Sequence, residues 1–326
     1  MMAQKKENNV KYVLLALIVM LLWGSLYPAG KLSYQECNVD SSYYPNLLLF
    51  AGTRFTISGT MIFLFQGVRT KSFPKVSGKK EWLGVALVAL FASVWNYSCT
   101  YLGLSMVESS KTALLKQSGI LVFIFFSFLI LKDEKFSVGK GIGAILGLVS
   151  IVALNSGDVG FSLGLGEVLI VLSSCGTVIS SVVIKKLLKS ANAITVTGYS
   201  QLFGGIVLFL IGLSLGGKFY FDELGDYFLF GYILLATCIS YVLWYSILQK
   251  TELSKMFIVK LSEPMFAAVI SAIILQENLL KIEYVIAFLC VGCALVVSNL
   301  NLQKLFSKKK GAEETGQEIA EETEQS

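Results

Sequence analysis

The chain has 326 residues, of which 55% are hydrophobic and only 15% are charged, and it carries a net charge of +5. Soluble domains usually have about a quarter of their residues charged, so the composition excludes an ordinary soluble protein. The chain contains no histidine, which excludes histidine-ligated metal sites and Ser-His catalytic pairs.

Ten apolar stretches follow one another along the chain, most of them close to the roughly 20 residues that a helix needs to cross a bilayer. In chain order they are 12–30, 46–68, 82–107, 112–131, 141–157, 168–184, 190–217, 227–249, 256–276 and 284–303. Only the second, fourth and ninth contain charged residues. The pattern predicts an all-α integral membrane protein with ten transmembrane helices and short connectors.

Lysine and arginine alternate between the connectors. Twenty of the 27 basic residues fall at the N-terminus, at the C-terminal side and in every second connector. Positive charge marks the cytoplasmic side of membrane proteins, so both termini are expected in the cytoplasm, which requires an even number of crossings. Localisation in a bacterial cytoplasmic membrane is expected from the same pattern and from the lysine-rich composition.

The two halves of the chain share a spaced motif. Ser110-Lys111 is followed by Lys116-x-Ser118, and Ser254-Lys255 is followed by Lys260-x-Ser262 at the same spacing. The match predicts one five-helix repeat over 1–155 and a second over 160–303. Because five is odd, the second repeat is inserted upside down relative to the first, an arrangement common in secondary transporters.

Residues 304–326 form a polar tail, rich in Glu, Gln and Thr after its first lysines. They contain too few apolar groups to order themselves, so we expect a disordered cytoplasmic segment.

Several short motifs resemble the drug/metabolite transporter superfamily, specifically the ten-helix EamA-type transporters. They are Trp23-Gly24-Ser25, Arg54-Phe55, Glu134 after the fourth helix, Glu263-Pro264 within the ninth, and Glu277 after it. The resemblance covers about residues 10–303 and implies a central cavity lined by both repeats. The family often has a proline where this chain has Leu121, so the bends of the fourth and ninth helices are expected to differ.

Arg54 is the strongest candidate for a substrate-binding residue. It lies about eight residues, or about 12 Å, inside its predicted helix. A buried arginine at that depth costs about 2.5–3.5 kcal/mol on insertion scales, so it should face protein or water. It could anchor a carboxylate or phosphate, or it could satisfy helix carbonyls or pair with an acid.

Lys116 and Lys260 lie about four residues inside their predicted spans, at equivalent positions of the two repeats. They could meet an anionic group from opposite sides, or extend to the nearest interface. Glu263 follows Lys260 by three residues, on the same helix face. The two could neutralise each other, or Glu263 could bind an amine or carry a proton. Pro264 can open the helix beside them.

Asn96, Gln201 and Trp244 complete the predicted substrate site. The two amides are costly on a lipid-facing surface, which favours an inward position. Trp244 belongs to a group of aromatic residues that could line a cavity or anchor the helices at the interface.

These features predict a secondary transporter that moves an amino acid or organic anion by alternating access. A broad-specificity exporter of drugs or aromatic compounds is the alternative, and a non-transporting membrane scaffold is an alternative of another class. Neither an enzyme nor any cofactor, metal or nucleic-acid partner is expected. The expected partners are a small-molecule substrate and the lipid bilayer, and a homodimer remains open.

Overall fold

The structure is a computed structural model that describes residues 2–72, 75–104, 106, 109–134, 137–154, 164–275 and 282–299. All regular elements within these residues are helical. Their bounds are α1 Met2–Glu36, α2 Tyr44–Thr70, α3 Gly78–Val88, η1 Ala89–Trp95, α4 Asn96–Leu104, α5 Ser109–Ile130, α6 Val138–Leu154, α7 Leu165–Leu187, α8 Ala193–Ser214, α9 Leu224–Lys250, α10 Leu253–Lys260, α11 Glu263–Leu275 and α12 Ile282–Asn299.

These elements form ten consecutive helical segments, because α3, η1 and α4 run on from one another and α10 and α11 share the ninth. Six segments are long and apolar enough to cross a membrane by length and composition, those of α1, α2, α3–α4, α7, α8 and α9. Shorter apolar stretches lie in α5, α6 and α12. The predicted all-α membrane fold is therefore confirmed. The polar tail predicted over 304–326 and Glu277 lie outside the described residues.

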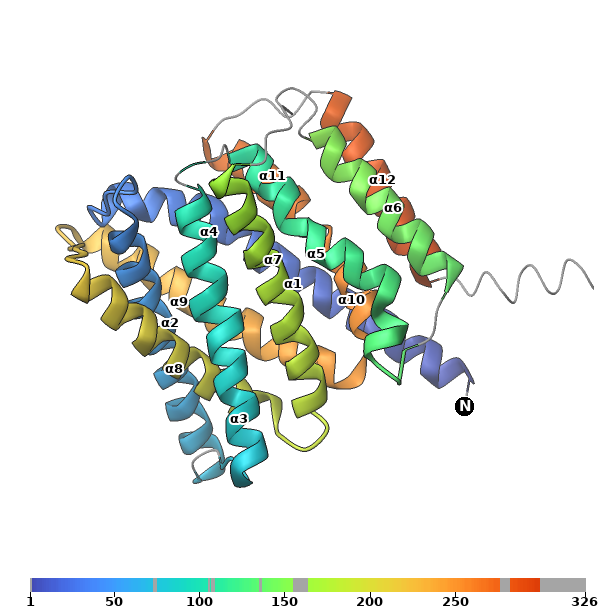
Figure 1. Ribbon diagram of the computed structural model, residues 1–326, viewed down its shortest axis with the longest axis horizontal. Coiled ribbons are helices and arrows are strands. Elements are labelled where there is room, and N and C mark those ends of the chain that lie inside the picture. The colour runs from blue at the N-terminus through green and yellow to red at the C-terminus, as the bar shows by residue number, and fades with distance from the viewer. Residues whose placement is uncertain are drawn as a thin grey trace, which may run out of the picture.

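The packing of the helices repeats itself between the two halves. Helix α1 packs against α9 and α11, and α7, the first helix of the second half, packs against α4 and α5. The second helices of the halves, α2 and α8, pair with each other, as do the fifth helices, α6 and α12 (Figure 1). The first helix of each half therefore packs against helices of the other half. This is the packing expected of two interlocked five-helix repeats.

Glycines bring α2 and α8 into close backbone contact. A Cβ atom on Gly205 would lie 2.3 Å from the backbone nitrogen of Thr56, and one on Gly52 would lie 2.2 Å from that of Phe209. Helices in lipid lack a hydrophobic drive to associate, so small residues that permit close packing hold them together. This tight pair fixes the position of Arg54, which lies on α2 between the two contacts.

The third segment contains an irregularity that its apolar sequence does not predict. Seven residues, Ala89–Trp95, form the π-helix η1. The indole nitrogen of Trp95 donates to the carbonyl of Leu172 on α7 at 2.8 Å, and Gly176 leaves room for the indole ring. A π-helical turn rotates the residues after it relative to a regular helix. Here it sets the directions of Asn96 and Tyr97, which follow immediately.

Candidate functional site

The ninth segment is broken near its middle, at Leu261 and Ser262. Helix α10 ends at Lys260 and α11 begins at Glu263, with Pro264 in its first turn, where proline is tolerated. The broken backbone is partly satisfied locally, because the Ser262 hydroxyl donates to the carbonyl of Val259 at 2.7 Å. The predicted opening of this helix beside Pro264 is confirmed, whereas α5, with Leu121 at the equivalent place, is continuous.

The two charges at the break face each other. The ammonium nitrogen of Lys260 lies 3.5 Å from a carboxylate oxygen of Glu263. A cation at a helix C-terminus and an anion at a helix N-terminus both complement the helix dipoles. Interrupted helices with charged ends near the middle of a bundle are typical of transporter binding sites.

Helix α1 supplies an aromatic wall to this charge pair. Lys260 lies over the ring of Trp23, 4.2 Å from its centroid, and 5.9 Å from that of Trp244 on α9. Gly24 permits this approach, since a Cβ atom there would lie 2.8 Å from the backbone nitrogen of Ala267 on α11. The predicted Trp23-Gly24 motif therefore places one aromatic face against the break.

Two further residues converge on Glu263. The phenol of Tyr27, one turn beyond Trp23 on α1, donates to the second carboxylate oxygen at 3.1 Å. Lys116 of α5 lies within electrostatic range of both Glu263 and Lys260. The structure thus brings together three charged residues that the sequence predicted as site residues, one from α5 in the first half and two from α10 and α11 in the second half.

Arg54 lies in a separate aromatic cage. Its guanidinium group donates to the phenol oxygen of Tyr97 at 3.3 Å and packs on the ring of Phe55, 4.5 Å from the centroid. Tyr34 and Tyr101 are also within its electrostatic range. Arg54 is only 9% exposed, and its Nε has no hydrogen-bond partner among the described residues.

Two tyrosines connect the Arg54 cage to the break. The hydroxyl of Tyr97 lies 3.4 Å from that of Tyr241 on α9. The ring of Tyr241 lies 5.4 Å from Trp23, which covers Lys260. We call the residues from Arg54 through Tyr97, Tyr241 and Trp23 to Lys260 the aromatic bridge. It joins two cations from opposite repeats along one polar and aromatic path.

Asn96 and Gln201 occupy different surroundings. The amide oxygen of Asn96 accepts from Thr100 and from Thr177 of α7, each at 3.5 Å, so the side chain ties α4 to α7. Gln201 is 2% exposed on α8, and neither atom of its amide has a hydrogen-bond partner within the described chain. Among the described residues, neither amide forms a hydrogen bond with a residue of the aromatic bridge, and their roles in binding stay predictions.

The residues around Arg54 were not predicted as a group. Tyr101 follows Tyr97 by one turn of α4, and Tyr34 follows Tyr27 by two turns of α1, so both pairs share a helix face. That spacing is a usable signal for aromatic lining. It does not reveal that the two faces meet around Arg54, because the helices are brought together only by packing.

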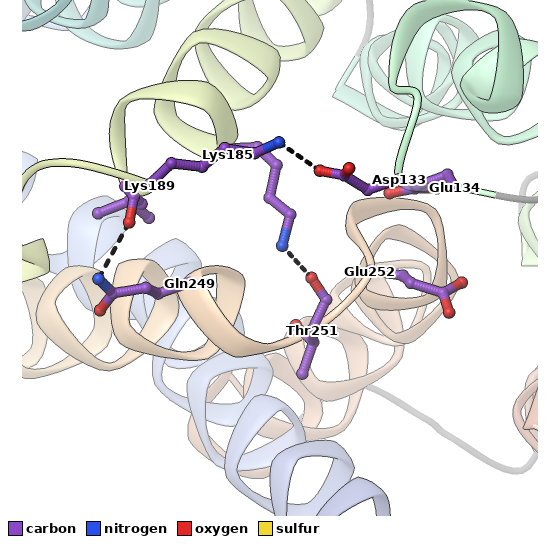
Figure 2. A pocket seen from close by; sticks show the side chains of 8 residues that line it. Asp133, Glu134, Lys185, Lys189, Gln249, Thr251 and Glu252 are labelled. Atoms are coloured by element: carbon purple, nitrogen blue, oxygen red, sulfur yellow. Dashed lines mark hydrogen bonds and ion pairs between the residues drawn. The ribbon is translucent and has the colours of Figure 1, made fainter.

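A second polar feature lies at the lysine-rich end of the bundle, in a cavity of about 190 Å³ (Figure 2). Lys185 reaches across it to the backbone carbonyl of Thr251 and also to that of Leu248, 2.7 Å away. Lys189 forms an ion pair with Asp133 on the opposite wall. The cavity lies between the α5–α6 connector, the end of α7 and the α9–α10 connector.

Glu134 lines the same cavity and binds the beginning of α10. Its carboxylate is buried and accepts the backbone N–H groups of Leu253, at 2.6 Å, and Ser254, at 3.2 Å. Lys140 binds Glu252 at 2.7 Å and lies 3.7 Å from Glu134. We call these contacts the Glu134 clamp. They fix the first repeat to the beginning of α10, the helix that ends at Lys260.

Charges in this region shift the acidities of two carboxyl groups outside the crossing segments. The hydrogen bond and charge of Lys189 lower the pKa of Asp133. Burial acts to raise the pKa of Glu252, but the hydrogen bond and charge of Lys140 and the charge of Lys255 outweigh it and lower that pKa. Both groups are therefore held in their ionised forms at neutral pH.

No cluster of three metal-ligating His, Cys, Asp or Glu side chains occurs among the residues that the structure describes.

Comparison with known proteins gives matches along almost the whole chain. A family model described as the EamA-like transporter family matches twice, over residues 10–156 and 164–299. The uncharacterized transporter YetK of Bacillus subtilis (strain 168) is 24% identical and is aligned over 94% of this chain and 90% of its own length. An uncharacterized transporter of Archaeoglobus fulgidus is 26% identical, with 82% and 91% covered. A crystal structure with 17% identity and a TM-score of 0.71, covering 89% of this chain and 98% of its own, shares the fold.

Proposed function

Because the chain belongs to the EamA-like transporter family, we propose that it is a secondary transporter that moves an amino acid or an organic anion across the cytoplasmic membrane by alternating access. Membership in this family points to membrane transport and away from catalysis. The alternation of lysine-rich connectors supports an orientation with both termini in the cytoplasm.

The observation that carries this proposal is the charge pair at the broken helix. Lys260 and Glu263 end two half-helices within a crossing segment, 3.5 Å apart, with Trp23 over the lysine and Tyr27 bound to the glutamate. A substrate carboxylate can replace Glu263 at Lys260, and a substrate ammonium can replace Lys260 at Glu263. With an amino acid, this exchange keeps both Lys260 and Glu263 paired, which is essential where water is scarce.

The Glu134 clamp supports the alternating-access part of the proposal. It holds α10 to the first repeat at the lysine-rich end, so opening a path there requires its hydrogen bonds to break. In inverted-repeat transporters, the two halves exchange conformations around a central site. The Glu134 clamp joins the two repeats at the start of α10, the helix that ends at Lys260. It is therefore suited to a change of conformation between the repeats.

The test is counterflow into proteoliposomes with a panel of labelled amino acids and carboxylic acids. We expect accumulation of at least one panel compound by the parental protein, and a loss of at least about tenfold in Lys260→Gln, as a charge-assisted contact is removed. Lys255→Gln, five residues earlier on the same helix, is the matched control and should transport normally. If Lys260→Gln and Arg54→Gln both transport at the parental rate, the proposed site is wrong.

The aromatic residues beside Lys260 also favour a second candidate, a broad-specificity exporter of aromatic compounds. The ring centroids of Tyr241 and Trp244 both lie within 5.4 Å of the ring centroid of Trp23. A surface formed by these three rings can bind planar molecules. Uptake of aromatic dyes that survives Lys260→Gln but not Trp23→Ala would favour this candidate over the amino acid or organic anion.

A further inference from the structure

The charges inside the crossing segments do not balance. Four charged side chains lie inside the ten apolar stretches of the sequence: Arg54, Lys116, Lys260 and Glu263. Three are cations and one is an anion. Unpaired charge is costly at this depth of a membrane, so an excess of two positive charges calls for a compensating partner.

The single carboxylate already pairs with one cation. Glu263 accepts from Tyr27 through one oxygen, and its other oxygen lies 3.5 Å from the ammonium nitrogen of Lys260 and has no hydrogen-bond donor among the described residues. No carboxylate of the described chain lies within ion-pair distance of Arg54, whose contacts are with phenols and the ring of Phe55. For Lys116, Glu263 is the one acidic group in electrostatic range within the part of the chain that the structure describes. The excess charge therefore belongs to both ends of the aromatic bridge.

Each end of the bridge also has a buried donor without an acceptor. The indole N–H of Trp23, beside Lys260, has no hydrogen-bond partner among the described residues, and neither has the Nε–H of Arg54. The two residues are 8% and 9% exposed. Buried donors in native proteins are nearly always satisfied, so both donors indicate oxygen atoms supplied by something else.

Resting on the proposed transport function, we propose that the substrate is a small dicarboxylate, bound with one carboxylate at Arg54 and the other at the Lys116–Lys260 end. Its carbon chain lies along Tyr97, Tyr241 and Trp23. Two carboxylates supply the two negative charges that the site lacks and the oxygen atoms that both free donors need. A monocarboxylate satisfies one end and leaves the other cation uncompensated.

The test compares each dicarboxylate from succinate to suberate with its own monomethyl ester, which has one charge fewer and nearly the same shape. Binding to the purified protein is read as a rise in apparent melting temperature, because a bound ligand stabilises by mass action. We expect at least one diacid to bind at least about tenfold more tightly than its ester. If no diacid exceeds its ester, the proposal is overturned.

Variants of the protein then test whether one of the two substrate carboxylates binds at Arg54. In Arg54→Gln the diacid should bind only as tightly as its ester, while the affinity for the ester stays unchanged. Arg69→Gln, at the exposed end of the same helix, should keep the parental preference. If Arg54→Gln proves unstable, Arg54→Lys keeps the charge and should retain a reduced preference. An equal loss for diacid and ester in either variant overturns the assignment.

Counterflow separates this inference from the transport proposal beneath it. Transport of leucine or another monocarboxylate, without transport of any diacid, leaves the transporter proposal standing and overturns the dicarboxylate. Transport of no compound of either panel overturns both.

Discussion

The carboxylate of Glu134, in the first half of the chain, accepts the backbone N–H of Leu253, in the second half, at 2.6 Å. These residues are 119 positions apart, and the contact caps the start of α10 from outside the helix. A helix N-terminus leaves its first N–H groups without intrahelical acceptors, so the capping carboxylate satisfies donors that burial would otherwise leave unpaired.

Removing this cap should destabilise the protein. We expect Glu134→Ala to cost about 1–3 kcal/mol, because two buried N–H groups lose their acceptor. Glu134→Gln should cost less, since its amide oxygen can still accept. Apparent melting temperatures in detergent check the order. Glu81→Ala, which removes an exposed carboxylate that caps the backbone of Ser77, is the control and should have a smaller effect. Equal melting temperatures for Glu134→Ala and the parent would contradict the capping role.

A methyl group at Gly24 should push α1 away from α11. The added Cβ would meet two backbone atoms of α11, at 2.8 and 3.0 Å, which cannot move as a flexible side chain would. We expect Gly24→Ala to cost about 1–3 kcal/mol and to reduce transport, because Trp23 shifts from Lys260.

Gly30, in the same helix, is the matched control for Gly24. No atom lies within 4 Å of a Cβ added there. Gly30→Ala should therefore be neutral, or stabilising by up to about 1 kcal/mol through helix propensity. Equal melting temperatures for the two variants would mean that α1 and α11 do not pack as described.

The pair Lys260–Glu263 should show strong energetic coupling, because both side chains are largely buried. Removing one partner leaves an uncompensated charge, whereas removing both does not. In a double-mutant cycle, we expect Lys260→Met combined with Glu263→Gln to be more stable than the single variants predict, by about 1–3 kcal/mol.

A second pair at the same spacing provides the reference. Lys255 lies 3.2 Å from Glu252, but both side chains are more exposed, at 28% and 38%. Its coupling should be at most about 1 kcal/mol, as is usual for pairs in contact with water. A coupling at Lys260–Glu263 no larger than this would show that its charges are solvated.

The contribution of Glu252 to stability should depend on acid pH. Its pKa in the folded protein is below the ordinary value of 4.5, so its ion pairs stabilise the fold fully above that value. The contribution is lost as pH falls through the lowered folded pKa. The difference in melting temperature between the parent and Glu252→Gln should be constant above about pH 5.5 and shrink below about pH 4.5. A difference that grows as the solution becomes more acidic would contradict the lowered pKa.

The helix break was predictable from sequence because its causes are local. Pro264 lacks a backbone donor, and the adjacent Glu263 favours a helix N-terminus, so the ninth segment divides where these residues stand. The inward position of Arg54 was predictable for a similar reason, since a charge inside an apolar segment must avoid lipid. Neither argument could place Tyr34 and Tyr101 near Arg54, because those contacts join different helices.

The sequence by itself determined the helical membrane fold and its ten segments. In lipid every backbone polar group must form a hydrogen bond within its own segment, so a long apolar stretch folds as a helix. Such a stretch can be recognised from the hydropathy of its own residues alone. The tertiary structure decided which charges meet. Whether Trp23 of α1 lies over Lys260 depends on the exchange of first helices between repeats and on the space that Gly24 leaves against α11. Apolar helix surfaces resemble one another too closely for hydropathy to specify such partners, and shape at close packing selects among them.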